Sequence, residues 1–205
     1  MENRNIIIIA KSAKHGAYCV AGIDLASSKL VRLVSNDKTT MYALTSDMIR
    51  YNDNKECEVL DVVKVRVISE KPLEIQRENI LIDTLTPFQY VRKARPMEIL
   101  LHGCVVPSIF GGLSQFIESR EEAIAIGYSL IMVKVKDIVL SESSSHKLKV
   151  SFKYRNQYCY NWSMTDPEFF YHPLGFLADR GMIVVSIPED DFQGKYYKFV
   201  AKILI

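Results

Sequence analysis

Short segments rich in β-branched and aromatic residues recur along almost the whole chain, and turn residues separate them. The first, residues 5–10, includes a run of isoleucines and predicts a buried strand. Residues 18–25 and 29–34 predict a hairpin, because only a short Ala-Ser-Ser linker separates them. Further strands are predicted at residues 59–69, 78–82, 99–106, 129–140, 146–154, 157–164, 182–187 and 196–205. This succession of short strands favours a β-barrel or β-sandwich fold.

Helical patterns are few. A short helix is predicted at residues 46–51, and the best candidate is residues 116–126, which Gly127 would terminate. Residues 11–16 are interpreted as a polar loop, and residues 87–96, which lie between two prolines, as a connector. A chain of 205 residues can hold one large β domain or two small ones. If it holds two, we expect the boundary between them near residue 88.

Composition excludes several classes of protein. The formal net charge is only +2, so any anion-binding surface must be local. The four cysteines are scattered without C-x-x-C pairs, and the histidines lack metal spacing, so we expect reduced thiols, no metal site and no cofactor. The apolar run near the N-terminus is too short for a signal peptide or a membrane span, which predicts a cytoplasmic protein with no membrane partner.

The most informative segment is residues 147–162. Alternate residues from Leu148 to Tyr154 are apolar, and those between them include Lys149 and Lys153, with Arg155 next in that series. Because side chains on a strand alternate between its faces, this pattern predicts one apolar face and one basic face. Tyr158, Tyr160 and Trp162 follow with the same period.

Cations can neutralise phosphates and aromatic rings can stack on bases, as in sites for single-stranded nucleic acid. The simpler interpretation, favoured by the period alone, is that the aromatic residues fill a core and the lysines form a solvated outer face. Aromatic side chains that point inward could not stack on a ligand bound to the basic face.

A second basic segment follows the first predicted strand. Lys11, Ser12, Lys14 and His15 precede Gly16 and could hold an anion, although the Walker pattern is absent. Ser12 and Lys14 do not make a catalytic site without an oxyanion donor or an orienting group. Arg32 would face either a ligand anion or Asp24 on the neighbouring strand, and the cross-strand ion pair is the preferred interpretation.

Several segments, in order along nearly the whole chain, resemble the bacterial dual OB-containing domain family. They are Lys11-Ser12-x-Lys14, Cys19 to Asp24, Val31 to Val34, Leu60 to Val63, Gln76-x-Glu78-Asn79, Phe152-x-Tyr154, Met164 to Pro167, and Tyr197 to Ile203. The resemblance implies a mainly β fold of two tandem OB-like β-barrels with one or two short helices. Residues 1–88 would form the N-terminal barrel, and residues 89–205 the C-terminal barrel with a connector and a short helix.

The resemblance also implies a ligand surface, since OB folds commonly bind oligonucleotides. It selects Lys11, Lys14 and Arg32 as contacts in the N-terminal barrel; local chemistry selects Lys149, Lys153 and Arg155 in the C-terminal one. The leading hypothesis is therefore binding of single-stranded nucleic acid or a nucleotide, without catalytic activity. The alternatives are a protein-interaction or adaptor module in a bacterial conflict or regulatory system, and an unrecognised enzyme.

Overall fold

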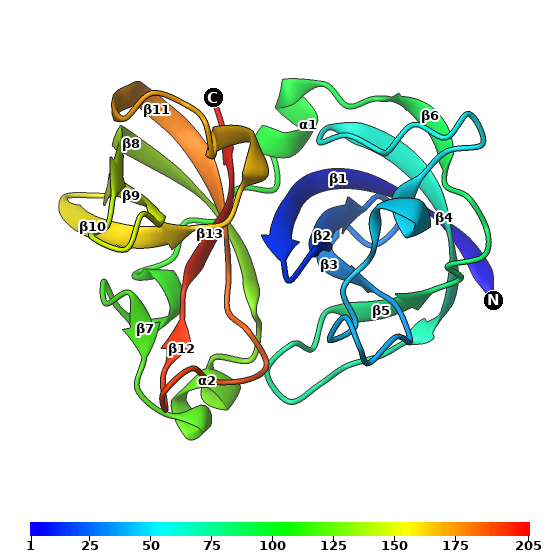
Figure 1. Cartoon of the computed structure of the whole chain (residues 1–205), viewed down its shortest axis with the longest axis horizontal. Coiled ribbons are helices and arrows are strands. Elements are labelled where there is room, and N and C mark those ends of the chain that lie inside the picture. The colour runs from blue at the N-terminus through cyan, green and yellow to red at the C-terminus, as the bar shows by residue number, and fades with distance from the viewer. The chain divides into compact units, whose positions relative to one another are not determined.

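The first barrel is a ring of five strands that pair in the order β1-β2-β3-β5-β4, and β4 pairs back onto β1. β3 and β5 run parallel, whereas the other neighbours are antiparallel. A sixth strand, β6, adds to the edge of β4 (Figure 1). The strands are β1 (Glu2–Lys14), β2 (Ala17–Asp24), β3 (Lys29–Val34), β4 (Asp61–Glu70), β5 (Asn79–Ile82) and β6 (Gln89–Lys93).

The second barrel repeats this arrangement. Its strands close in the order β8-β9-β10-β13-β11, and the pair β10 and β13 is parallel, as β3 and β5 are. A two-stranded ribbon of β7 and β12 lies outside the ring. These strands are β7 (Phe116–Ile117), β8 (Leu130–Glu142), β9 (Leu148–Tyr154), β10 (Gln157–Met164), β11 (Gly175–Ser186), β12 (Tyr196–Tyr197) and β13 (Phe199–Leu204). The mainly β fold of two barrels is therefore confirmed.

The two barrels define two units, and the structure describes all residues from 1 to 205. The first unit comprises residues 1–72 and 78–102, and the second comprises residues 73–77 and 103–205. The boundary between independently folding domains that the sequence predicts near residue 88 stays a prediction. No helix is long and apolar enough to cross a membrane.

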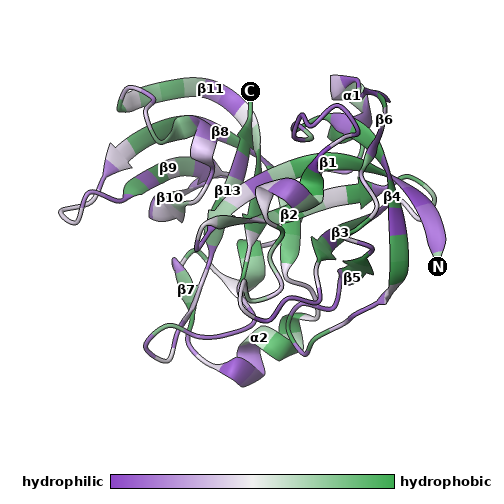
Figure 2. Ribbon diagram, turned by 45° about the vertical axis from the view of Figure 1, so that its right-hand side comes forward, coloured by the Kyte–Doolittle hydropathy of each residue, from purple (hydrophilic) through white to green (hydrophobic).

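Alternation of side chains builds a separate core in each barrel. Ile6 and Ile8 of β1 pack with Val20, Val31 and Leu33 in the first core. The second core is lined by inward residues of β8 to β13. In Figure 2 hydrophobic stretches follow the barrel strands, whereas the connecting loops are mainly hydrophilic. Burial of these apolar side chains is the main force that closes each ring.

Three sequence predictions need correction. β1 continues to Lys14, so the predicted loop at residues 11–16 is reduced to a turn at His15 and Gly16. The predicted connector at residues 87–96 contains β6, because extended backbone there can pair with the edge of β4. The strand predicted at residues 99–106 does not form. Its first residues belong to α1 (Pro96–Leu100), for which Pro96 provides a favourable first residue, and Cys104 makes only an isolated bridge to Val133.

The remaining helices are short. α2 (Arg120–Ile126) begins four residues later than predicted, because β7 uses Phe116 and Ile117. Gly127 ends α2 in the left-handed conformation, as predicted. Single 3-10 turns occur at Ser46–Ile49, Ile109–Gly111 and Pro167–Phe169.

Residues 73–77, between β4 and β5, belong to the second unit and complete its core. Ile75 is 1% exposed and packs among the apolar residues of that core. Its backbone N–H and that of Gln76 donate to Glu189 Oε2 at 3.1 and 3.0 Å. The Gln76 side chain donates to the Ile187 carbonyl at 3.1 Å. Five residues from the first half of the chain therefore stabilise the second barrel.

Lys198 is a charged side chain inside the second unit, and it is 1% exposed. Its Nζ donates to the carbonyl oxygens of Ile109 at 2.8 Å and Gly112 at 2.9 Å. The ring of Trp162 lies 5.4 Å from the same nitrogen. Burial lowers the pKa of Lys198 to about 8, because removing the charged amine from water is unfavourable.

We expect Ile75→Ala to destabilise the second unit by about 2–4 kcal/mol, because the substitution leaves a cavity in a closed core. Urea denaturation followed by the fluorescence of Trp162, the only tryptophan, measures the change. Leu85→Ala is the control: Leu85 is 93% exposed, so the change should stay within about 0.5 kcal/mol. Equal stabilities of the two variants would contradict the assignment of residues 73–77 to this core.

The low pKa of Lys198 predicts a pH dependence. An unfolded lysine has a pKa of about 10.4, so between about pH 8 and pH 10.4 the unfolded chain binds more protons at this site than the folded chain. The contribution of Lys198 to stability is therefore present at high pH and is lost as the pH falls through about 8. The free energy of unfolding of the wild type should rise relative to that of Lys198→Met over this range, as measured by circular dichroism in urea.

Candidate nucleic-acid interface

The β9–β10 hairpin presents the two faces that the sequence predicted. Val150, Phe152 and Tyr154 point into the core of the second barrel. Lys149 and Lys153 alternate with them and therefore lie on the outer face. Arg155 occupies the hairpin turn with a φ of 54° and is exposed.

A bulge in β10 divides the three aromatic residues between the faces. Cys159 pairs with Phe152 and Trp162 with Val150, so β10 uses three steps where β9 uses two. Asn161, within the bulge, has a φ of 55°. Trp162 therefore points into the core, whereas Tyr158 and Tyr160 point outward. The predicted common period fails at Trp162, because one extra residue reverses the alternation.

The two outward tyrosines form a stacked pair. Their ring centroids are 5.6 Å apart with an interplanar angle of 20°, and the side chains remain 44% and 63% exposed. Lys153 Nζ lies 5.5 Å from the centroid of the Tyr158 ring. The Tyr158 hydroxyl donates to Asp137 Oδ2 at 3.2 Å, and this hydrogen bond raises the pKa of Tyr158. The aromatic residues thus lie on the basic face, which removes the geometric objection raised by the sequence.

Strand register places a row of cations beside this pair. Tyr158 is opposite Lys153, Lys153 is opposite Lys136 of β8, and Lys136 is opposite Arg180 of β11. No carboxylate lies within 4.0 Å of Lys153, Lys136 or Arg180, whereas many other cations of the chain are in ion pairs. We call Tyr158, Tyr160, Lys153, Lys136 and Arg180 the outer row.

Lys149 lies on the same outer face but is more enclosed. Its Nζ donates to Ser163 Oγ at 2.8 Å. Partial burial, with a smaller effect of neighbouring Lys147, lowers the pKa of Lys149. Lys149 and Lys153 thus share the outer face of β9, and Arg155 lies at the hairpin turn, with its guanidinium 6.0 Å from the centroid of the Tyr154 ring.

The cations predicted in the first barrel contact their own unit. Lys11 Nζ binds Glu56 Oε2 at 2.9 Å and the Cys57 carbonyl at 2.7 Å, and Lys14 Nζ donates to the Met41 carbonyl at 3.3 Å. Arg32 is 6% exposed and lies 3.6 Å from Glu78. The predicted ion pair between Asp24 and Arg32 is absent, because the β2–β3 register places Arg32 opposite Ala21 instead.

Lys136 and Arg180 were not predicted as site residues. Alternating lysines at positions 134 and 136 are a visible signal, since they follow the same period as the lysines of β9. Arg180 joins the outer row only because the β8–β11 register places it opposite Lys136, and no pattern of neighbouring residues predicts that register. No group of three or more histidine, cysteine or acidic residues could hold a metal ion.

Fold and surface together define a protein with two five-stranded barrels of one topology, one of which carries exposed aromatic and cationic side chains on its second and third strands. This is the face on which OB-type barrels carry ligands. The model of the dual OB-containing domain family matches residues 4–203, and the chain belongs to that family. No protein of curated function and no solved structure matches it.

We expect Arg32→Ala to lower the stability of the first unit by about 3 kcal/mol, because Glu78 would lose a partner in a buried setting. Lys153→Ala should change stability by less than about 0.5 kcal/mol, since Lys153 lies on the outer face. Thermal unfolding of both variants by calorimetry tests the contrast. If the two variants unfold at the same temperature, Arg32 does not stabilise the first unit.

Proposed function

We propose that the chain binds single-stranded nucleic acid through the outer row, without catalysing a reaction. The observation that carries the proposal is the stacked pair Tyr158 and Tyr160 on the same exposed face as unpaired cations. A stacked pair with partly exposed rings offers a surface on which an unpaired base can pack, and every base has such a face. A cytoplasmic location remains part of this proposal.

The preference for a single strand follows from how bases become accessible. In a duplex, neighbouring base pairs already stack on each other, so aromatic side chains on a sheet surface cannot reach the base faces. In a single strand the bases can splay onto Tyr158 and Tyr160 while Lys153, Lys136 and Arg180 lie near the phosphates. The net charge of only +2 fits electrostatic attraction of phosphates at one local site, and not non-specific binding along the length of a nucleic acid.

A second candidate function is protein interaction through the edge strand β6. All five residues of β6 are exposed, including Tyr90 at 55% and Val91 at 46%. One edge of β6 pairs with β4, and its other edge has no strand partner. Exposed edges can accept a strand from another protein. A stable protein partner together with no affinity for nucleic acid would favour this candidate.

Tyr160→Ala should weaken binding of labelled oligo-dT and oligo-U by about tenfold, because loss of one stacking ring costs about 1–3 kcal/mol. Fluorescence anisotropy at low salt measures the dissociation constants. The matched control is Tyr171→Ala: Tyr171 is 98% exposed and lies in the loop between β10 and β11. If both variants bind as the wild type does, the tyrosine pair is not a stacking surface.

Lys153→Ala should reduce the salt dependence of binding. Each phosphate contact on a single strand contributes about 0.7 to the slope of log K against log salt concentration, so this slope should become shallower by about that amount. Lys55→Ala, which removes an exposed lysine of the first unit, should leave the slope unchanged. An unchanged slope for Lys153→Ala would argue against phosphate contact at this residue.

A further inference from the structure

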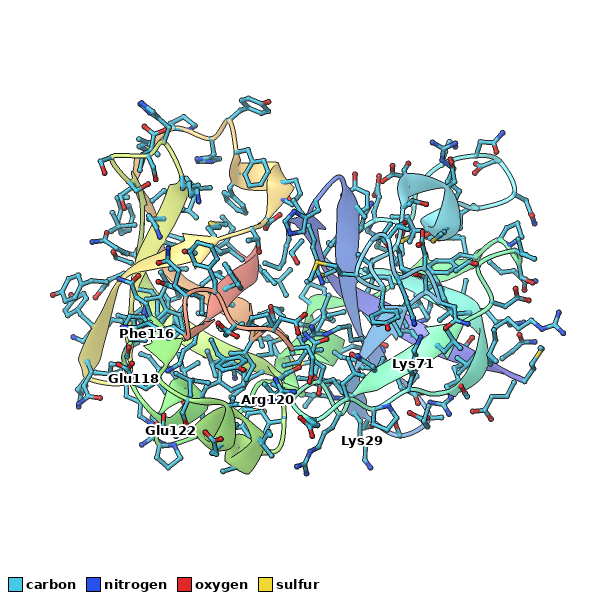
Figure 3. The ribbon with its side chains drawn as sticks, turned by 60° about the horizontal axis from the view of Figure 1, so that its bottom comes forward. Lys29, Lys71, Phe116, Glu118, Arg120 and Glu122 are labelled. Atoms are coloured by element: carbon cyan, nitrogen blue, oxygen red, sulfur yellow. The ribbon has the colours of Figure 1, made fainter.

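The ribbon of β7 and β12 presents a second aromatic surface on the second unit. Phe116 pairs with Tyr197, and Ile117 pairs with Tyr196. Ile117 and Tyr196 are buried in the core, so Phe116 and Tyr197 point to the other side. Phe116 is labelled in Figure 3, where it precedes Glu118 and Arg120 along the segment that leads into α2.

Four aromatic rings gather on that side. The centroid of Tyr197 lies 5.6 Å from that of Phe116, 6.2 Å from that of Phe192 and 6.5 Å from that of Phe199. Phe192 is 65% exposed, although it is a large apolar side chain in a short loop. We call Phe116, Phe192, Tyr197 and Phe199 the ribbon cluster. Core packing explains the buried partners Ile117 and Tyr196 but does not explain why Phe192 is held in solvent.

The loop that carries Phe192 is fixed by its own hydrogen bonds. Phe192 and Lys195 exchange backbone hydrogen bonds of 2.9 and 3.2 Å, and the Asp191 carboxylate accepts from the Gly194 N–H at 2.7 Å. Lys195 Nζ lies 3.8 Å from the centroid of Phe116 and 3.7 Å from Glu118 Oε2. The loop thus holds Phe192 beside Tyr197 before any ligand arrives, and Glu118 offsets part of the charge of Lys195.

The ribbon cluster continues the face that carries the outer row. Phe199 of β13 is opposite Ser163 of β10, and Ser163 accepts the hydrogen bond from Lys149. The Gln115 side chain, next to β7, donates to the Tyr160 carbonyl at 3.1 Å. Ser163 is opposite Lys149 and therefore lies on the outer face of β10, which also carries Tyr160. Phe199, opposite Ser163, and Tyr197, two residues before it, lie on the same face, and Gln115 links this segment to Tyr160.

We propose that the ribbon cluster is a second base-stacking platform, on which a single strand that occupies the outer row continues. This inference rests on the proposed function and extends it: the site takes a longer single strand than the tyrosine pair alone can hold. Glu118 lies beside Lys195, so the platform acts through stacking and adds little neutralisation of phosphates.

The test compares labelled oligo-dT of about 5 and about 15 nucleotides, which spans the range of lengths bound by OB barrels. Phe192→Ala should weaken binding of the longer probe about fivefold to tenfold and leave the shorter probe, held by the outer row, within about twofold. The slope of log K against log salt concentration should be unchanged, in contrast to Lys153→Ala.

Phe170→Ala is the matched control. Phe170 is 46% exposed and follows the 3-10 turn Pro167–Phe169 in the loop after β10. Its ring contacts none of the four rings of the ribbon cluster, so its loss should affect neither probe. Thermal unfolding verifies that both variants keep the fold.

The outcomes separate the two proposals. A wild type that binds neither probe overturns the proposed function before any variant is made. Binding of both probes by the wild type, with no loss for the longer probe in Phe192→Ala, overturns the second platform alone. Equal losses for both probes also overturn it, because Phe192 would then belong to one common site.

Discussion

Both barrels depend on a first strand that pairs with two different partners. β1 and β8 each have 13 residues. β1 pairs with β4 through its first half and with β2 mainly through its second half. β8 pairs with β11 from Leu130 to Leu140 and with β9 from Lys136 to Glu142. A strand that must belong to both sides of a closed ring has to bend, and each contains a register shift at its middle. In β8 that shift includes Asp137, the acceptor for Tyr158, so closure of the barrel also fixes one end of the tyrosine pair.

The two barrels share one topology but differ in their outer surfaces. In the first barrel Ile7, Ala21, Ile23 and Arg32 are not part of the core cluster, yet each is at most 6% exposed. In the second barrel the corresponding strands β9 and β10 keep tyrosines and lysines accessible. The fold alone therefore does not decide which barrel carries a ligand. The chemistry of the outward residues distinguishes them.

Local sequence patterns predicted much of this fold. The hairpin of β2 and β3, the alternation in β9 and the terminal glycine of α2 all follow from near neighbours in the chain. β6 could not be predicted, because its exposed residues form a strand only where β4 offers an edge. In the candidate site the alternation of residues predicted the outward lysines of β9. That Tyr158 and Tyr160 face outward while Trp162 faces the core depends on one extra residue in β10. Arg180 and the ribbon cluster require pairings between segments far apart in sequence.

The segment at residues 73–77 has a consequence for how such proteins can be divided. The chain enters the second unit at residue 73, returns to the first at 78 and leaves it again after 102. No single cut yields two complete barrels: a fragment that begins at residue 103 lacks Ile75 and the backbone donors that Glu189 accepts. A gene rearrangement that moved one barrel alone would leave an open core behind. The family model likewise covers both units, from residue 4 to residue 203.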